Sequence, residues 1–259
     1  MGVERQNRDC RRYEVTLMNW MAEAHSRKHL FAAGLAFLIL MCVVHPVAGA
    51  DLIQCSNSNV VVEGANREDR DYTCQAAAAA LGFLKDNGLN VDWPVKVHFS
   101  TNLPIETDSN AAGCYDLDHD LITVISLSEC YASGRTRTLF YEPLDRDINN
   151  SVIAHEVAHA IALKNFVGKK TSRAALEYIA YVTQLSTLPQ PVRDRILRKY
   201  TKMIFENTVQ INSIFLMVNP AKFAVGSYRH FRQPENGSAF WQYLLTEEIE
   251  LDGEFLQRF

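Results

Sequence analysis

Residues 152–164 read VIAHEVAHAIALK, a stretch that is apolar apart from two histidines, one glutamate and the final lysine. Apolar residues on nearly every side predict a helix that is buried in the core of a folded domain. The Asn-Asn-Ser run at residues 149–151 can cap this helix, because such side chains accept hydrogen bonds from the first backbone N–H groups. The helix therefore carries His155, Glu156 and His159 into the interior of the protein.

The three polar residues of this helix form the pattern H-E-x-x-H. His155 and His159 lie four residues apart, so they share one helix face and can bind the same metal ion. Glu156 is turned about 100° around the helix axis, where it can take a proton from water that the metal activates. The pattern predicts a zinc site. The alternative is a pair of core histidines that are hydrogen-bonded to the backbone, which leaves the buried carboxylate of Glu156 unexplained.

A catalytic zinc ion usually has three protein ligands and one open position, so a third ligand is needed. The extended pattern H-E-x-x-H-x-x-G-x-x-H is absent, because Ala162 and Asn165 stand where glycine and histidine would be. Glu177 is the candidate, since it lies among apolar residues on the next predicted helix, which a loop through residues 168–170 can fold back onto the first. Glu206 is the alternative candidate for the third ligand.

This combination resembles the gluzincins, zinc metallopeptidases that have H-E-x-x-H and a downstream glutamate on the following helix. The resemblance implies that His155, His159 and Glu177 hold zinc and that Glu156 is the general base. It extends loosely over residues 95–245. It also implies a zincin-like fold in which a sheet precedes the motif helix.

The same resemblance assigns roles outside the metal ligands. The edge strand of the sheet would hold an extended peptide, and residues 121–127 are the candidate strand. Tyr228 and His230 are the candidate donors to the oxyanion that forms during peptide hydrolysis, although a tyrosine and a histidine at a helix end are as often structural. Two positions depart from the family pattern: Tyr178 stands where many relatives have glycine, and Tyr181 where some have an aspartate that supports a ligand.

The residues around the motif predict an α+β fold, with a small mixed sheet and helices first and a mainly helical part afterwards. Residues 95–99 and 121–127 alternate as strands do, and the acidic run at 116–120 is interpreted as a solvated turn and not a calcium loop. Helices are expected at residues 69–87, 152–164, 172–185, 192–205, 208–218, 221–231 and 238–255.

The first fifty residues predict an export signal. An uncharged run at residues 30–44 follows Arg27 and Lys28 and precedes the small residues that end at Ala50, the pattern of a cleaved signal peptide. Residues 51–259 would then form a single domain that is secreted or periplasmic, with no stable membrane insertion. An uncleaved signal anchor is the alternative, but the run is shorter than the roughly 20 residues of a membrane span.

The part after the predicted cleavage site retains four cysteines, and an even number in an exported chain predicts two disulfides. Three connectivities are possible for four cysteines. Nearest-neighbour pairing closes the shortest loops and predicts Cys55–Cys74 and Cys114–Cys130. A cysteine-rich metal site is disfavoured, because no C-x-x-C spacing occurs.

The composition is that of an ordinary globular protein, with 47% hydrophobic and 22% charged residues. A net charge of −4 gives no indication of nucleic-acid binding. The leading hypothesis is therefore an exported, monomeric zinc metallopeptidase that acts on a peptide or protein substrate. Two alternatives remain: a zinc-binding scaffold without turnover, and a zinc hydrolase or self-processing factor that acts on a non-peptide substrate of the cell envelope.

Overall fold

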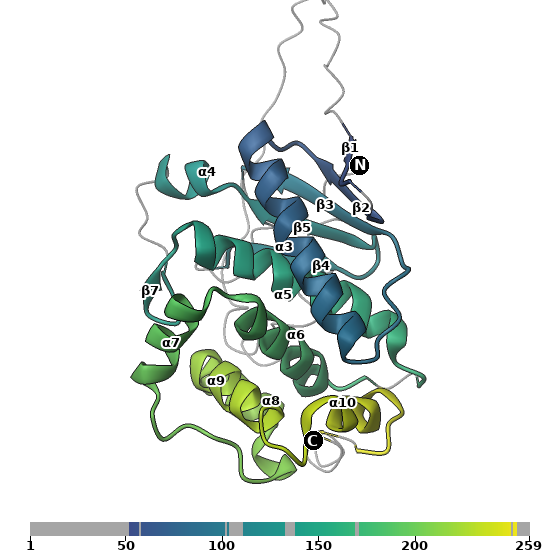
Figure 1. The fold of residues 1–259 in the computed structure, drawn as a ribbon, viewed down its shortest axis with the longest axis vertical. Coiled ribbons are helices and arrows are strands. Elements are labelled where there is room, and N and C mark those ends of the chain that lie inside the picture. Colours follow the sequence, from purple (N-terminus) through teal and green to yellow (C-terminus); the bar gives the residue numbers. More distant parts are fainter. Residues whose placement is uncertain are drawn as a thin grey trace, which may run out of the picture.

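The computed structural model describes residues 52–252, except 57, 102, 104–110, 133–137, 169–170 and 250 (Figure 1). The export signal predicted for residues 1–50 lies outside the described residues. Within the described part of the chain, no helix combines the length and the apolar character that crossing a membrane requires.

The described residues form an α+β fold, which confirms the predicted class. The strands are β1 (Ile53–Gln54), β2 (Val60–Glu63), β3 (Val95–Ser100), β4 (Gly113–Asp116), β5 (Leu121–Ile125), β6 (Thr138–Leu139) and β7 (Glu142–Pro143). The helices are α3 (Arg67–Asp86), α4 (Leu127–Ala132), α5 (Arg146–Asn165), α6 (Arg173–Thr187), α7 (Gln190–Lys199), α8 (Ser213–Val218), α9 (Pro220–Phe231) and α10 (Gly237–Leu245), with a 3-10 turn η1 (Thr208–Gln210) before α8.

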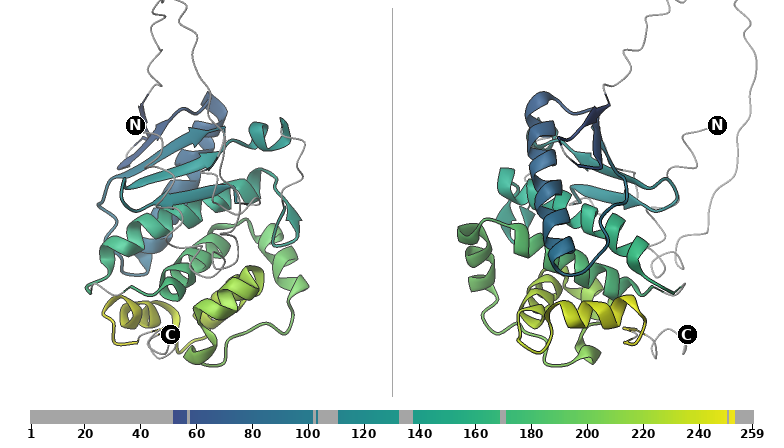
Figure 2. Two further views of the ribbon diagram at one scale, coloured as in Figure 1. Left: turned by 180° about the vertical axis from the view of Figure 1, so that it is seen from behind. Right: turned by 45° about the vertical axis from the view of Figure 1, so that its right-hand side comes forward.

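Five strands form a mixed sheet in the order β1-β2-β3-β5-β4. The three inner strands are parallel, and β1 and β4 are antiparallel to them at the two edges. In β3, Val95, Val97 and Phe99 are buried while Lys96 is exposed, so one face of the sheet is packed and the other is more open. The buried strand residues share a hydrophobic cluster with α3 and α5, and Figure 2 shows the sheet and these helices from two further sides.

The edge of the sheet differs from the prediction. Residues 121–127 were expected to be the edge strand, but β5 lies between β3 and β4 and pairs with both. The edge strand is β4, whose sequence Gly-Cys-Tyr-Asp lacks the alternation that predicts a strand. A turn over residues 117–120 reverses the chain between β4 and β5, so the predicted turn is confirmed. Tyr115 and Lys164 both donate to the carboxylate of Asp120 in this turn.

The motif helix α5 begins earlier than predicted. Asp145 caps it by accepting a hydrogen bond from the backbone N–H of Ile148, at 2.9 Å. Residues 149–151 therefore lie inside the helix and not at its cap. The following helix α6 starts as predicted, with Ser172 accepting from the N–H of Ala175 at 3.0 Å.

Three helical regions beyond α6 differ from their predicted ranges, whereas α9 matches the helix predicted at residues 221–231. The helix predicted at residues 192–205 ends with α7 at Lys199, and the helix predicted to reach residue 255 ends with α10 at Leu245. The single helix predicted for residues 208–218 is divided into η1 and α8. Asn212 interrupts it, because its side chain caps α8 by accepting from the N–H of Phe215.

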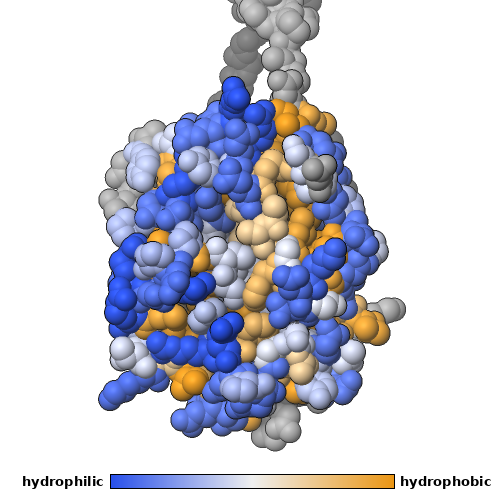
Figure 3. All heavy atoms as spheres, in the orientation of Figure 1, coloured by the Kyte–Doolittle hydropathy of each residue, from blue (hydrophilic) through white to orange (hydrophobic). Residues whose placement is uncertain are grey.

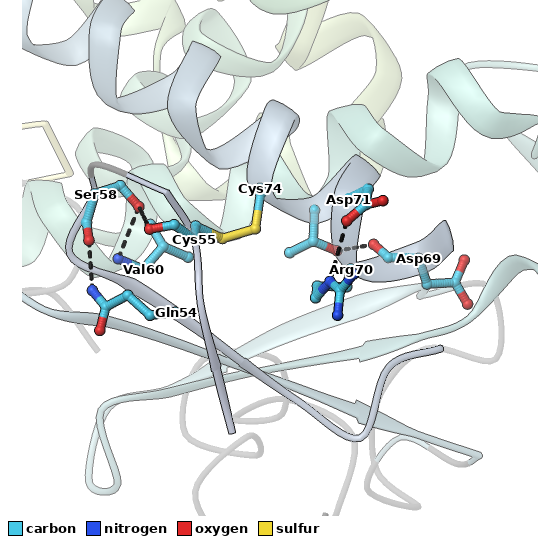
Figure 4. The surroundings of a disulfide bond; sticks show 9 residues. Gln54, Cys55, Ser58, Val60, Asp69, Arg70, Asp71 and Cys74 are labelled. Carbon is cyan, nitrogen blue, oxygen red and sulfur yellow. Dashed lines mark hydrogen bonds and ion pairs between the residues drawn. A yellow bond between two sulfur atoms is a disulfide. The ribbon is translucent and has the colours of Figure 1, made fainter. Parts of the chain in front are cut away.

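A disulfide connects the first strands to α3. Cys55, in the segment between β1 and β2, is bonded to Cys74 on α3, with 5.5 Å between their Cα atoms (Figure 4). The second predicted pairing is wrong, since Cys114 and Cys130 are not joined. Cys114 lies on the edge strand β4, while the buried side chain of Cys130 packs against a hydrophobic cluster with Leu127. Short spacing along the chain is not sufficient to place two Cβ atoms in the geometry of a disulfide.

An apolar stripe runs down the middle of the face shown in Figure 3, in the region that α3 crosses in Figure 1. Helix α3 contains consecutive alanines at positions 76–80, of which Ala78 and Ala79 are exposed. Ala76, Ala77 and Ala80 are buried against the core. The small side chains let α3 lie close to its neighbours, and the exposed ones account for apolar surface along this helix.

Candidate metal centre

Helices α5 and α6 bring the three predicted ligands together. His155 and His159 project from α5 and Glu177 from α6, and one ligand atom of each lies within 4.8 Å of the others. The Nε2 atoms of the two histidines are 3.0 Å apart. The carboxylate oxygens of Glu177 lie 3.4 Å from Nε2 of His155 and 3.6 Å from Nε2 of His159.

These distances fit a bound zinc ion. Ligand atoms that lie 2.0–2.2 Å from a tetrahedral zinc are separated from one another by about 3.4 Å. The three side chains have small but measurable exposed fractions, 12% for His155, 15% for His159 and 17% for Glu177. Three protein donors with limited access to solvent leave a fourth coordination position for an exchangeable ligand.

Two of the three ligand side chains have charge states that favour metal binding, whereas burial acts to lower the pKa of His155 but the contact with Glu177 and its charge raise it. Burial lowers the pKa of His159 to about 4, with the charges of His155 and Arg173 adding to the effect. Burial acts to raise the pKa of Glu177, but the charge of His159 and the contact with His155 outweigh it and lower the pKa to about 2. At neutral pH, His159 is thus neutral and Glu177 ionised, the forms that bind a metal.

A hydrogen-bonded chain behind His155 orients its ring. Ser151 donates to the carbonyl oxygen of Ile148 at 2.7 Å, so its hydroxyl oxygen accepts from Nε2 of Gln184 at 3.1 Å. The other end of the Gln184 amide, Oε1, lies 3.1 Å from Nδ1 of His155. Because an amide oxygen can only accept, Nδ1 carries the proton and Nε2 presents its lone pair to the metal position.

Gln184 is a site residue that the sequence pattern did not reveal. It lies seven positions after Glu177 on α6, at a spacing that places both on one helix face. Tyr181 lies on that face too, and its ring packs against His155 with 4.6 Å between ring centres. The side chain that supports the ligand therefore comes from position 184, one turn beyond the position at which some gluzincins have an aspartate.

Glu156 is buried beside the cluster and under the edge strand of the sheet. Its side chain is 7% exposed. A Cβ atom added to Gly113 of β4 would lie 3.0 Å from Cγ and 3.2 Å from Oε1 of Glu156, and 2.8 Å from a methyl group of Val152. Only glycine lets β4 approach α5 this closely, so Gly113 is a second residue that the sequence analysis missed.

The two predicted oxyanion donors make contacts with residues other than the three metal-ligand candidates. The Nδ1 atom of His230 shares a 2.8 Å hydrogen bond with the hydroxyl of Tyr178, and its ring packs against Phe240. Tyr228 packs against the hydrophobic cluster that contains Leu127 and Cys130, and the guanidinium of Arg193 lies 6.0 Å from the centre of the Tyr228 ring. These contacts give no support to an oxyanion role for Tyr228 or His230.

Tyr178 holds His230 through this hydrogen bond. It follows Glu177 directly, so its side chain is turned about 100° from the face that carries the ligand. It is fully buried, and burial raises the pKa of its hydroxyl well above the usual value. Burial likewise lowers the pKa of His230. The pair is a neutral hydrogen bond within the core, where glycine could not replace Tyr178.

The fold and the cluster define an α+β protein with a two-histidine, one-carboxylate metal-binding candidate at the packed surface of two helices. The chain belongs to the family described as "Family of unknown function (DUF6639)", whose pattern matches residues 60–254. This range contains every residue of the candidate site. No curated protein and no solved structure matches the chain.

Proposed function

We propose that the protein is an exported zinc metallopeptidase that hydrolyses peptide bonds. The observation that carries the proposal is the convergence of His155, His159 and Glu177 at separations suited to zinc. The orienting chain through Gln184 adds to it, because ligating histidines commonly donate their second N–H to a supporting group.

The residues around the cluster have the roles that hydrolysis requires. Zinc held by the three ligands would supply Lewis-acid chemistry that activates water and polarises the peptide carbonyl group. Glu156 takes the proton of the attacking water and delivers it to the leaving nitrogen. The edge strand β4, which lies against Glu156 at Gly113, offers backbone groups to an extended peptide.

The proposed export is supported by the Cys55–Cys74 disulfide, because such bonds persist in oxidising compartments outside the cytosol. The absence of an aspartate at position 181 is the sequence feature that favours the scaffold alternative. Its weight is reduced, since Gln184, one helical turn further along α6, contacts His155.

The decisive experiment separates metal binding from turnover. We expect purified protein to contain one zinc per chain and to cleave members of a diverse peptide library. Glu156→Gln should keep its zinc and its fold but lose activity by about 10²–10⁴-fold, the usual contribution of general acid–base catalysis. Glu206→Gln, at an exposed glutamate, is the matched control and should behave as the wild type. A zinc-loaded wild-type protein that cleaves nothing would favour the scaffold, and a protein without zinc would contradict both.

A further inference from the structure

Arg173 is a charged residue at the edge of the candidate metal centre that the proposed mechanism does not use. It is the first residue of α6 and precedes Glu177 by four positions, so the two side chains share one face of the helix. It is half-buried. Its Nε atom is buried and has no hydrogen-bond partner among the residues that the structure describes.

The guanidinium of Arg173 is near the cluster without being neutralised by it. Its charge adds to burial in lowering the pKa of His159, and it adds to His159 and His155 in lowering the pKa of Glu177 against the effect of burial. The two oxygens of Glu177 nevertheless face the histidines. Within the described residues, no carboxylate forms an ion pair with Arg173.

Other arginines of partial burial have partners. Arg146 binds the carboxylates of Glu68 and Asp69, and Arg193 donates to the backbone carbonyl oxygen of Ser186. Arg229 donates to backbone carbonyl oxygens, among them those of Leu197 and Met203. A guanidinium N–H that is buried without an acceptor costs free energy. Among the described residues, Arg173 therefore differs from these arginines in that no carboxylate or carbonyl group of the chain pairs with its guanidinium.

We propose that Arg173 binds a carboxylate group of the peptide substrate beside the metal centre. This inference rests on the proposed peptidase function and names its substrate class. A guanidinium offers parallel N–H donors that match a carboxylate in a bidentate geometry. With zinc bound, two positive charges of the ion and one of Arg173 face the negative charges of Glu156 and Glu177, so the site attracts an anion. The carboxylate can be the C-terminus of the peptide or an acidic side chain.

The test measures binding without turnover. Zinc-loaded Glu156→Gln protein is titrated calorimetrically with three peptides of one sequence: a free C-terminal acid, its C-terminal amide, and an amide that contains one glutamate. We expect an acid-bearing peptide to bind about 10- to 100-fold more tightly than the neutral amide, the range expected for hydrogen bonds to charged groups. Adding Arg173→Gln should remove this difference, while Arg173→Lys should keep part of it. Arg198→Gln removes an exposed arginine on α7 and should leave the difference unchanged.

Each outcome decides one point. Preference for the free acid assigns the C-terminal carboxylate, and preference for the glutamate peptide assigns an acidic side chain. Equal binding of all three peptides, or a preference that survives in Arg173→Gln, overturns the role of Arg173 while the peptidase proposal stands. Binding of no peptide, together with a wild-type protein that cleaves nothing, contradicts the peptidase function itself. Circular dichroism of each variant shows whether the fold is intact, and Arg173→Lys provides the comparison if Arg173→Gln is unfolded.

Discussion

The amide oxygen of Gln184 lies 3.1 Å from Nδ1 of His155, and this contact fixes which nitrogen of the ring can bind a metal. Gln184 and its partner Ser151 are both nearly fully buried, at 2% and 3% exposed. The amide cannot turn over without placing its NH₂ group against the protonated Nδ1. The neutral side chain of Gln184 on α6 therefore orients the ring of His155 on α5.

Gln184→Leu should weaken zinc binding about 10- to 100-fold, the usual effect of losing a group that supports a metal ligand. The physical reason is that Nδ1 of His155 and the hydroxyl of Ser151 lose their partner together. Gln184→Glu should retain most of the affinity, because a carboxylate oxygen still accepts from Nδ1. Competition with a chromogenic chelator measures the dissociation constants. Gln190→Leu, at an exposed glutamine on α7, is the control, and equal affinities in all variants would show that the contact has no role in binding.

Gly113→Ala should lower turnover at least tenfold and leave the zinc content unchanged. The added methyl group would lie 2.8 Å from a methyl of Val152 and 3.0 Å from Cγ of Glu156, so β4 or the carboxylate must move. Such overpacking costs about 1–3 kcal/mol of stability. Urea unfolding and peptide hydrolysis are the two measurements.

The matched control for this change is Gly82→Ala on α3. A Cβ atom there has no neighbour within 4 Å, so the change should leave activity intact. It should stabilise the helix by up to about 1 kcal/mol, since alanine favours helices more than glycine does. If Gly113→Ala cleaved peptides at the wild-type rate, the close approach of β4 to Glu156 would have no catalytic meaning.

Zinc stoichiometry should identify the third ligand. His155→Ala and His159→Ala each remove one of three donors and should abolish binding of one zinc per chain. Glu177→Ala should weaken binding strongly, whereas Glu206→Ala should have no effect, because Glu206 is exposed and the structure places Glu177 within the cluster. Metal analysis by mass spectrometry after dialysis gives the stoichiometry. Full zinc occupancy in Glu177→Ala would remove this residue from the ligand set.

The metal-free protein should lose stability as the pH falls from about 6.5 towards 4. In this window an unfolded chain protonates His159, while the folded protein, in which burial lowers the pKa of His159 to about 4, does not. The unfolded state thus binds more protons, so the free energy of unfolding decreases as the pH decreases. Glu177 has a pKa lowered to about 2, so its contribution is lost at more acidic pH, as the pH falls through that value.

Urea titrations at several pH values test this dependence. His159→Asn should flatten the stability profile between pH 4 and 6.5. His119→Asn, at the exposed turn between β4 and β5, should keep the wild-type slope. A mutant profile at His159 that parallels the wild type would contradict the assignment.

The sequence predicted the residues of the metal-binding cluster better than the edge of the sheet and the ends of the helices. His155 and His159 could be found because spacing along a helix is a local property that survives folding. Glu177 could be found because it lies among apolar residues on the next predicted helix. The start of the following helix near residue 172 followed from the same kind of local rule. Their convergence in the structure agrees with the prediction, while the identity of the metal stays a proposal.

The missed features depend on contacts between segments that are distant in the sequence. Gln184 reads as an ordinary helix residue until Ser151 and His155 are placed next to it. The need for glycine at position 113 is visible only once β4 is placed against α5. The predicted disulfide between Cys114 and Cys130 was wrong for the same reason, because separation along the chain does not determine the direction in which a side chain points.

The bond between Cys55 and Cys74 also bears on how the protein is best produced. A chain made in a reducing cytoplasm would lack a crosslink that closes a loop of 19 residues and contributes about 3 kcal/mol. Thiol reductants in purification buffers would act on the same bond. Oxidative expression hosts and reductant-free buffers are therefore the suitable choice for preparing material for assays.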